Sequence, residues 1–336
     1  MLLARNIVLP ILSGIQGKAN AIAGTGGLIL GCAREGGLRM NKIPVWKTIA
    51  SGYGFTFGQL GTIIGLIWLP MVIAAVAGYF VMSQYYSAFP AAMEQGDAAA
   101  AGQAALLVIG WSIVSLVLSS IMYSAVTRQA LGERRGPALI AFQFGSTELR
   151  VFGAILALFF LLIVFLVIYL MLAGMGAFAA KALLAGLPQK AQAAAVGLYA
   201  LALLAAIFFV MVRLSFLMIP AAVAEGNFGL VRSWQLSEGN FWRILLVGLL
   251  TLAPLLAVML AAEVAILGPD FFMPHNVAPG DADAQLKDMI AQMRAAAPHM
   301  PLLYGFSFLV APLATGLGLA PAAFAYRALK GDTAGN

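Results

Sequence analysis

The residues with the most potential for chemistry are two charged side chains inside long apolar stretches, Arg213 in residues 196–219 and Glu263 in residues 244–267. A charge is costly to bury in a bilayer, so such residues often mark a substrate path or a proton relay. Arg213 precedes Pro220 by seven residues, which places it about 10 Å from the end of its stretch. Its long side chain can either bind an anionic group or extend to the interface. Glu263 lies near the end of its stretch, where it either stays hydrated or becomes protonated inside a bundle.

A stripe of hydroxyl groups is the second candidate. The hydroxyl residues of stretch 104–126 recur in steps of three or four, which keeps them on one face of a helix: Ser112, Ser115, Ser119, Tyr123 and then Thr127. Such a stripe either lines a hydrated path or lets helices approach closely and hydrogen-bond to one another. We expect close packing here.

Several kinds of site are excluded by the residue counts. The sequence contains one cysteine, Cys32, and two histidines, His275 and His299, which share one polar loop over 268–300. No disulfide within the chain, thiolate metal cluster, bis-histidine haem site or Ser–His–Asp set can be built from these residues. The loop also contains aspartates, but its pattern over 281–297 predicts an amphipathic helix that lies on the membrane or caps the bundle, with apolar positions Leu286, Met289, Ile290 and Met293. We therefore expect no catalytic residue, no cofactor, no metal site and no enzyme activity.

The composition indicates what must position these side chains. Apolar residues make up 62% of the 336 residues and charged residues 10%, and the mean hydropathy is +0.96, far outside the range of soluble domains. Six stretches are long enough to cross a bilayer as helices. The sequence therefore predicts an all-α polytopic membrane protein with spans at 60–82, 104–126, 151–173, 196–219, 244–267 and 301–326.

The basic residues predict the orientation. Fourteen lysines and arginines lie before the first span, after the even-numbered spans and at the C-terminus, whereas four lie in the loops 83–103, 174–195 and 268–300. Because cytoplasmic loops carry the excess of Lys and Arg, we expect both termini in the cytoplasm. The net charge of +6 is then explained by topology, and we expect no binding to nucleic acid.

The spans show a threefold pattern. A triplet with internal spacings of four and seven residues precedes each odd-numbered span, and the copies are 91 and 90 residues apart: Ile49/Tyr53/Leu60, Ile140/Phe144/Val151 and Leu230/Trp234/Phe241. The even-numbered spans end alike and are followed by glycines, namely Gly132, Gly226 and Gly331. This predicts three tandem units, each an interfacial helix followed by a transmembrane hairpin. In the first interfacial helix we expect an apolar stripe of Trp46, Ile49, Tyr53 and Phe57.

One cytoplasmic segment carries a resemblance. Residues 232–243, RSWQLSEGNFWR, and the preceding 220–226, PAAVAEG, resemble the region before the fifth span in a broad bacterial group of six-helix membrane proteins. That group includes the membrane domain of some glycerophosphoryl diester phosphodiesterases and many stand-alone members of unknown function. The resemblance covers residues 41–330 and implies the fold but no activity. The conspicuous residues of this interfacial segment are Arg232, Trp234, Glu238, Asn240, Trp242 and Arg243.

The predicted organisation has three parts. Residues 1–40 are expected to be a flexible extension or a wrongly assigned start, 41–330 a six-helix membrane domain, and 331–336 a short cytoplasmic tail. We expect a non-enzymatic protein of the bacterial inner membrane that organises lipids or partner membrane proteins. The alternative is a transporter of a small amphipathic or lipidic solute that uses Arg213 and the hydroxyl stripe. A less favoured alternative is an intramembrane enzyme acting on lipid head groups.

Overall fold

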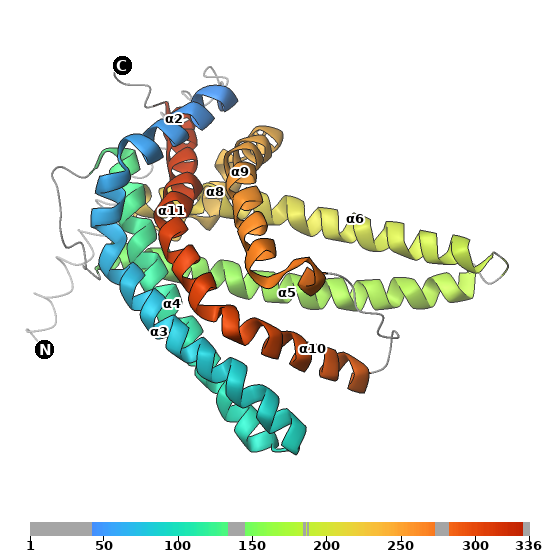
Figure 1. Ribbon diagram of the computed structural model, residues 1–336. Coiled ribbons are helices and arrows are strands. Elements are labelled where there is room, and N and C mark those ends of the chain that lie inside the picture. Colours follow the sequence, from blue (N-terminus) through green and yellow to red (C-terminus); the bar gives the residue numbers. More distant parts are fainter. Residues whose placement is uncertain (1–41, 134–144, 184–185, 187, 273–281, 332–336) are drawn as a thin grey trace, which may run out of the picture. The chain divides into compact units, whose positions relative to one another are not determined.

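The computed structural model describes residues 42–133, 145–183, 186, 188–272 and 282–331 (Figure 1). The chain divides after Asn41, and all described residues belong to the unit Lys42–Asn336. The predicted extension, residues 1–40, and all but the first residue of the predicted tail lie outside the described residues.

The described residues form helices and no strand, which confirms the predicted all-α class. The short helices α2 (Val45–Gly58), α7 (Met218–Glu225), α8 (Leu230–Leu236) and α10 (Ala282–Ala296) accompany the long ones. Short 3-10 turns occur at η1 (Pro269–Phe272) and η2 (Ala297–His299). The long helices are α3 (Leu60–Gln95), α4 (Ala98–Leu131), α5 (Ser146–Leu183), α6 (Gln189–Ser215), α9 (Phe241–Leu267) and α11 (Met300–Lys330).

Six helical segments are long and apolar enough to cross a membrane, one for each predicted span. The fourth consists of α6 and α7, which are separated at Phe216 and Leu217. The amphipathic helix predicted over 281–297 is also present as α10, and it contacts α3. The chain is thus a helical, multi-pass membrane protein.

The predicted loops 83–103 and 174–195 are mostly helical. Helices α3, α4 and α5 contain 36, 34 and 38 residues, or about 51–57 Å at the rise of an α-helix, against a hydrocarbon layer of about 30 Å. The extra turns are rich in alanine, which favours helix without adding a strong hydropathy signal. A tight turn at Gly96 and Asp97 joins α3 to α4, and the Asp97 carboxylate caps α4 by accepting from the N–H groups of Ala99 and Ala100.

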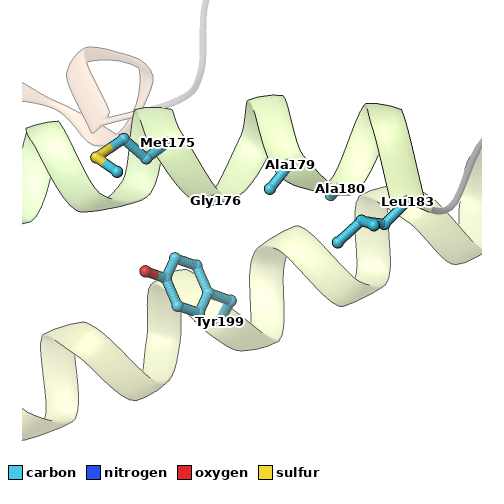
Figure 2. A pocket seen from close by; sticks show the side chains of 6 residues that line it. All are labelled: Met175, Gly176, Ala179, Ala180, Leu183 and Tyr199. Atoms are coloured by element: carbon cyan, nitrogen blue, oxygen red, sulfur yellow. The ribbon is translucent and has the colours of Figure 1, made fainter.

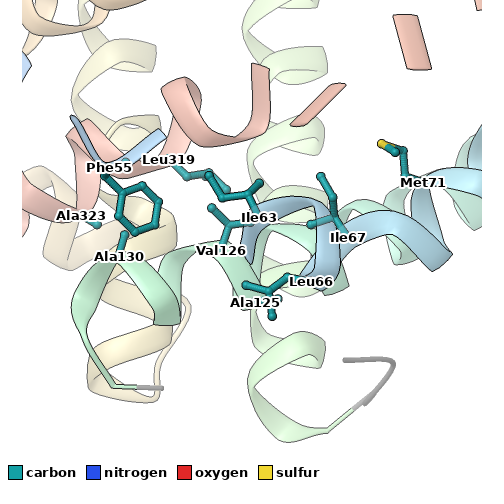
Figure 3. Packing of buried hydrophobic residues seen from close by; sticks show 11 residues of the cluster. Phe55, Ile63, Leu66, Ile67, Met71, Ala125, Val126, Ala130, Leu319 and Ala323 are labelled. Atoms are coloured by element: carbon teal, nitrogen blue, oxygen red, sulfur yellow. The ribbon is translucent and has the colours of Figure 1, made fainter. Parts of the chain in front are cut away.

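Most of the buried core lies at one end of the helices, which we call the packed end. It comprises α2, α7 and α8, the first turns of α3, α5 and α9, and the last turns of α4 and α11. One core cluster joins α2, α3, α4 and α11 (Figure 3), and its members are Phe55, Ile63, Leu66, Ile67, Met71, Ala125, Val126, Ala130, Leu319, Ala320 and Ala323. A second joins α2, α7, α9 and α11 and includes Ile49, Leu217, Ile244, Val247 and Tyr326.

The α5–α6 hairpin is buried only at the packed end. In α5 the buried residues are Thr147, Glu148, Val151 and Ala154, and α6 has none. Farther out the two helices contact each other, as where the Tyr199 ring lies over Gly176 (Figure 2). A Cβ at position 176 would lie 2.3 Å from a carbon of that ring, so glycine permits this approach.

Helix α2 packs on α11 through small residues. A Cβ on Gly52 would lie 2.6 Å from the Pro321 ring, and one on Gly316 would lie 2.7 Å from Thr56. The buried side of α2 is therefore Thr48, Ile49, Gly52, Phe55 and Thr56. Of the predicted stripe, Ile49 belongs to this buried side, whereas Trp46 and Phe57 are exposed.

The predicted repeat has partial structural counterparts. Helices α2 and α8 precede α3 and α9, whereas residues 134–144, which contain most of the middle triplet, lie outside the described residues. Gly132, Gly226 and Gly331 end α4, α7 and α11 with φ of 76°, 71° and 84°. The tandem-unit description itself stays a prediction.

Candidate functional site

Arg213 joins α6 to α8 at the packed end. Its Nε donates to Ser237 Oγ at 3.0 Å and its Nη2 donates to the Trp234 carbonyl at 2.9 Å. The guanidinium carbon lies 3.8 Å from the centre of the Trp234 ring, within the range of a cation–π contact. Ser233 Oγ in turn donates to the Arg213 carbonyl at 2.7 Å. The charge of Arg213 is thus held by the short helix beside it, with no carboxylate in salt-bridge distance among the described residues.

The start of α8 is fixed by Gly229. This residue has φ of 71°, and a Cβ there would lie 2.2 Å from the Met218 carbonyl oxygen. Its N–H donates to Asn227 Oδ1 at 2.8 Å. A side chain at position 229 would therefore meet both backbone strain and a clash, so this turn determines where α8 can sit against α7.

Glu225 connects α7, α8 and α11. Its Oε1 accepts from Arg232 Nε at 2.9 Å and from the Tyr326 hydroxyl at 2.8 Å. The carboxylate is partly buried, with 22% of its side chain exposed. Because a charged acceptor strengthens both bonds, these contacts fasten the last turns of α11 to the α7–α8 corner.

Glu148 makes the corresponding connection between α4 and α5. Its Oε1 accepts from Ser124 Oγ at 2.9 Å and lies 3.5 Å from Arg128 Nη1, while its Oε2 accepts from the Gly145 N–H at 2.9 Å. Only 7% of the Glu148 side chain is exposed. The last bond also satisfies an N–H group at the start of α5, as expected for a carboxylate in the first turn of a helix.

The chain entering α2 is fixed to the start of α9. Asn240 Oδ1 accepts from the Ile43 N–H at 3.2 Å, and Arg243 Nη1 donates to the Ile43 carbonyl at 3.0 Å. The N–H and the carbonyl of Ile43 are thus both hydrogen-bonded to side chains at the start of α9. Farther along, the Tyr53 hydroxyl donates to the Thr251 carbonyl at 2.9 Å and joins α2 to α9.

The outer surface of the packed end combines exposed aromatic residues with basic ones. Trp46 is 73% exposed and Trp242 is 77% exposed. The described part of this end contains nine lysines and arginines, Lys42, Lys47, Arg128, Arg150, Arg213, Arg232, Arg243, Arg327 and Lys330, against four glutamates, Glu133, Glu148, Glu225 and Glu238. Glu148 and Glu225 form ion pairs with Arg128 and Arg232, so seven basic residues and two glutamates remain at this end.

The predicted interfacial segment divides into two groups. Arg232, Trp234, Asn240 and Arg243 hold helices together through the contacts above. Trp242 and Glu238 are exposed, and Glu238 contributes its backbone carbonyl as an acceptor for Asn240 Nδ2 at 3.4 Å.

The hydroxyl stripe does not gather around a site. Ser112 Oγ donates to the Val108 carbonyl and Ser115 Oγ to the Ser112 carbonyl, both within α4. Ser112 is exposed, and Ser119 and Tyr123 are partly buried. The buried hydroxyl groups of α4 belong to Ser120 and Ser124, on the neighbouring face, and to Thr127, the last residue of the stripe.

Glu263 lies far from Arg213 along the chain and is not brought to the packed end. It is partly buried in the last turns of α9, and no described residue forms an ion pair or hydrogen bond with its carboxylate. His275 and Asp281 lie outside the described residues. Among those that the structure describes, no group of His, Cys, Asp and Glu side chains could hold a metal ion.

The sequence interpretation missed Glu148 and Glu225. Both lie just outside the predicted spans, where a carboxylate is ordinary and its presence does not by itself indicate a buried contact. A usable signal was present, because arginines accompany each of them in the sequence, Arg128 and Arg150 for Glu148 and Arg232 for Glu225. Tyr326 gave no signal, since tyrosine is common at membrane interfaces.

The comparisons with known proteins give no family. No protein-family model, no curated protein and no solved structure matches this chain. The fold and the packed end define a class, a multi-pass helical membrane protein.

Proposed function

We propose that this protein is a non-enzymatic component of a bacterial inner membrane that organises lipids. The packed end faces the cytoplasm together with both termini and binds the anionic head groups of that leaflet. We also propose membership of the six-helix group that residues 220–243 resemble. Partner membrane proteins are the second kind of ligand that such a surface can hold.

The observation that carries the proposal is the pairing of Trp46 and Trp242 with a positive surface. Tryptophan is favoured at the level of the head groups, because its ring is apolar and its N–H is polar. These two residues are the most exposed tryptophans at this end, and the end carries nine basic residues. Each basic residue near an anionic leaflet contributes about 1 kcal/mol of attraction.

The internal carboxylates support the same assignment. Glu148 and Glu225 accept their bonds from neighbouring helices of the fold, so neither projects a free negative charge toward the head groups. The exposed residues Lys42 and Lys47 flank the exposed Trp46 at the start of α2. This is the arrangement expected of a basic, aromatic helix at an anionic surface.

The test compares two phospholipids around the reconstituted full-length protein. Spin-labelled phosphatidylglycerol and phosphatidylcholine report how strongly each lipid is held beside the protein. We expect a preference for phosphatidylglycerol that weakens with salt, because exposed charges are screened. The variant Lys42→Gln/Lys47→Gln loses much of this preference, whereas the matched variant Lys181→Gln/Lys190→Gln, at the far end of α5 and α6, keeps it. Equal binding of the two lipids by the unmodified protein would refute the proposal.

The transporter alternative has no supporting observation. It requires Arg213 to meet a solute, and the guanidinium instead contacts Trp234 and Ser237. Ser112 and Ser115 of the hydroxyl stripe donate to backbone carbonyls of their own helix.

A further inference from the structure

A groove lies between α3 and α11, away from the packed end. It has a volume of about 500 Å³ and is lined by Val72, Ala75, Val76, Tyr79, Phe80, Pro301, Tyr304, Gly305 and Phe308. The α3 residues recur in steps of three or four, as do Pro301, Tyr304 and Phe308 on α11, so each helix presents one face to the groove. Two of the lining residues, Ala75 and Gly305, are small.

The position of the groove along α3 places it in one leaflet. Counted from Leu60, where α3 begins, Val72 is about 18 Å and Phe80 about 30 Å along the helix. The hydrocarbon layer is about 30 Å thick, so the groove occupies the half that is farther from the packed end. Ser83 and Gln84 follow shortly after Phe80, which agrees with an interface at that level.

The lining is apolar and open to the lipid side. Val76 is 53% exposed and Phe80 is 59% exposed. The rings of Tyr79 and Tyr304 meet edge to face, with 6.0 Å between their centres. They lie at the end of the groove nearer the interface. Gly78 lets this wall form, because a Cβ there would lie 3.0 Å from Trp111 and 3.2 Å from Tyr304. No charged residue lines the groove.

We propose that this groove binds one acyl chain of a phospholipid from the leaflet on the far side of the packed end. The groove is about 12 Å long, because Val72 and Phe80 are eight helical steps apart on α3, and this length is close to the depth of one leaflet. A single hydrocarbon chain can lie along an apolar hollow of this length, and van der Waals contact with the lining holds it where no water is present.

This inference is independent of the proposed head-group preference. The proposed function uses charges at the packed end, whereas the groove recognises a hydrocarbon chain in the other leaflet. The experiment therefore uses phosphatidylcholine, which carries no net charge, so that a failed charge preference leaves this test unaffected.

Gly305 offers a direct way to fill the groove. A Cβ at this position meets no atom within 4 Å, so Gly305→Leu places a side chain in the hollow without displacing a neighbour. Gly110 is also exposed in a spanning helix with no atom within 4 Å of its Cβ position, and it does not line the groove. Gly110→Leu is therefore the matched control.

The test is photocrosslinking of the full-length protein in phosphatidylcholine vesicles, with a diazirine in one acyl chain of a tracer lipid. We expect crosslinks on the peptides of Tyr79 and Tyr304 several-fold above those on the lipid-exposed residues Leu162 and Leu166 of α5. Gly305→Leu lowers the groove crosslinks several-fold, and Gly110→Leu leaves them unchanged. Thermal unfolding of each variant in detergent shows whether the fold is retained.

Two results would overturn the inference. One is equal labelling of the groove and of α5 in the unmodified protein, a measurement that does not depend on the folding of any variant. The other is a crosslink from the groove to a second copy of the chain in place of lipid.

Discussion

Replacing Arg213 is predicted to release α8 from α6. The guanidinium makes two hydrogen bonds, to Ser237 and to the Trp234 carbonyl, and lies over the Trp234 ring. A hydrogen bond involving a charged group contributes about 1.5–3 kcal/mol, and a cation–π contact at a partly exposed site about 1 kcal/mol. Because Arg213 is partly exposed and Trp234 keeps its bond from Ser237, we expect Arg213→Ala to lower the free energy of unfolding by about 2–4 kcal/mol.

The assay is thermal unfolding of the full-length protein in detergent, followed by tryptophan fluorescence, together with limited proteolysis between α8 and α9. Arg213→Lys keeps the charge but loses the planar group that stacks and donates in two directions. Its melting temperature should therefore fall between that of Arg213→Ala and that of the unmodified protein. Lys181→Ala, at an exposed position at the far end of α5, should melt like the unmodified protein. If Arg213→Ala also melts like the unmodified protein and is cut no faster after α8, the reasoning about this contact is wrong.

Three further predictions concern packing, polar contacts and topology. Gly52→Leu should lower the free energy of unfolding by about 1–3 kcal/mol through overpacking against α11, whereas Gly54→Leu, whose Cβ meets nothing within 4 Å, should have little effect on the melting temperature. Glu148→Gln should lower the free energy of unfolding by about 1–3 kcal/mol, because the charged partner of Ser124, Gly145 and Arg128 becomes neutral. An unchanged melting temperature would contradict this role of Glu148. In a background without the natural cysteine, Ala99→Cys should react with an impermeant maleimide added to intact cells and Lys47→Cys should react only after permeabilisation; the reverse pattern would contradict the proposed orientation.

The spans were predictable because hydropathy over about 20 residues depends on composition alone. The helix ends were not, because alanine-rich turns such as those around Ala92 and Ala101 are weakly hydrophobic and strongly helical. These turns also lie in tertiary contact, and Ala92 and Ala101 are 4% and 6% exposed. Packing of this kind depends on which helices meet, which one sequence does not specify.

The candidate site was predictable only in part. The pattern of Trp234 and Trp242 indicated an interfacial segment, and the structure places both at the packed end. It separates their roles, however, since Trp234 lies under Arg213, whereas Trp242 is exposed. The partners of Glu148 and Glu225 come from helices far apart in the sequence, such as Tyr326 on α11. Local spacing contains no information about such pairs.

The uneven burial of α5 and α6 has a mechanical consequence. The pair is anchored by Glu148, Val151 and Ala154 at one end, and α5 then extends for a total of about 57 Å. With so long an arm and so short a base, a slight tilt where α4, α5 and α7 meet becomes a large displacement at the tip.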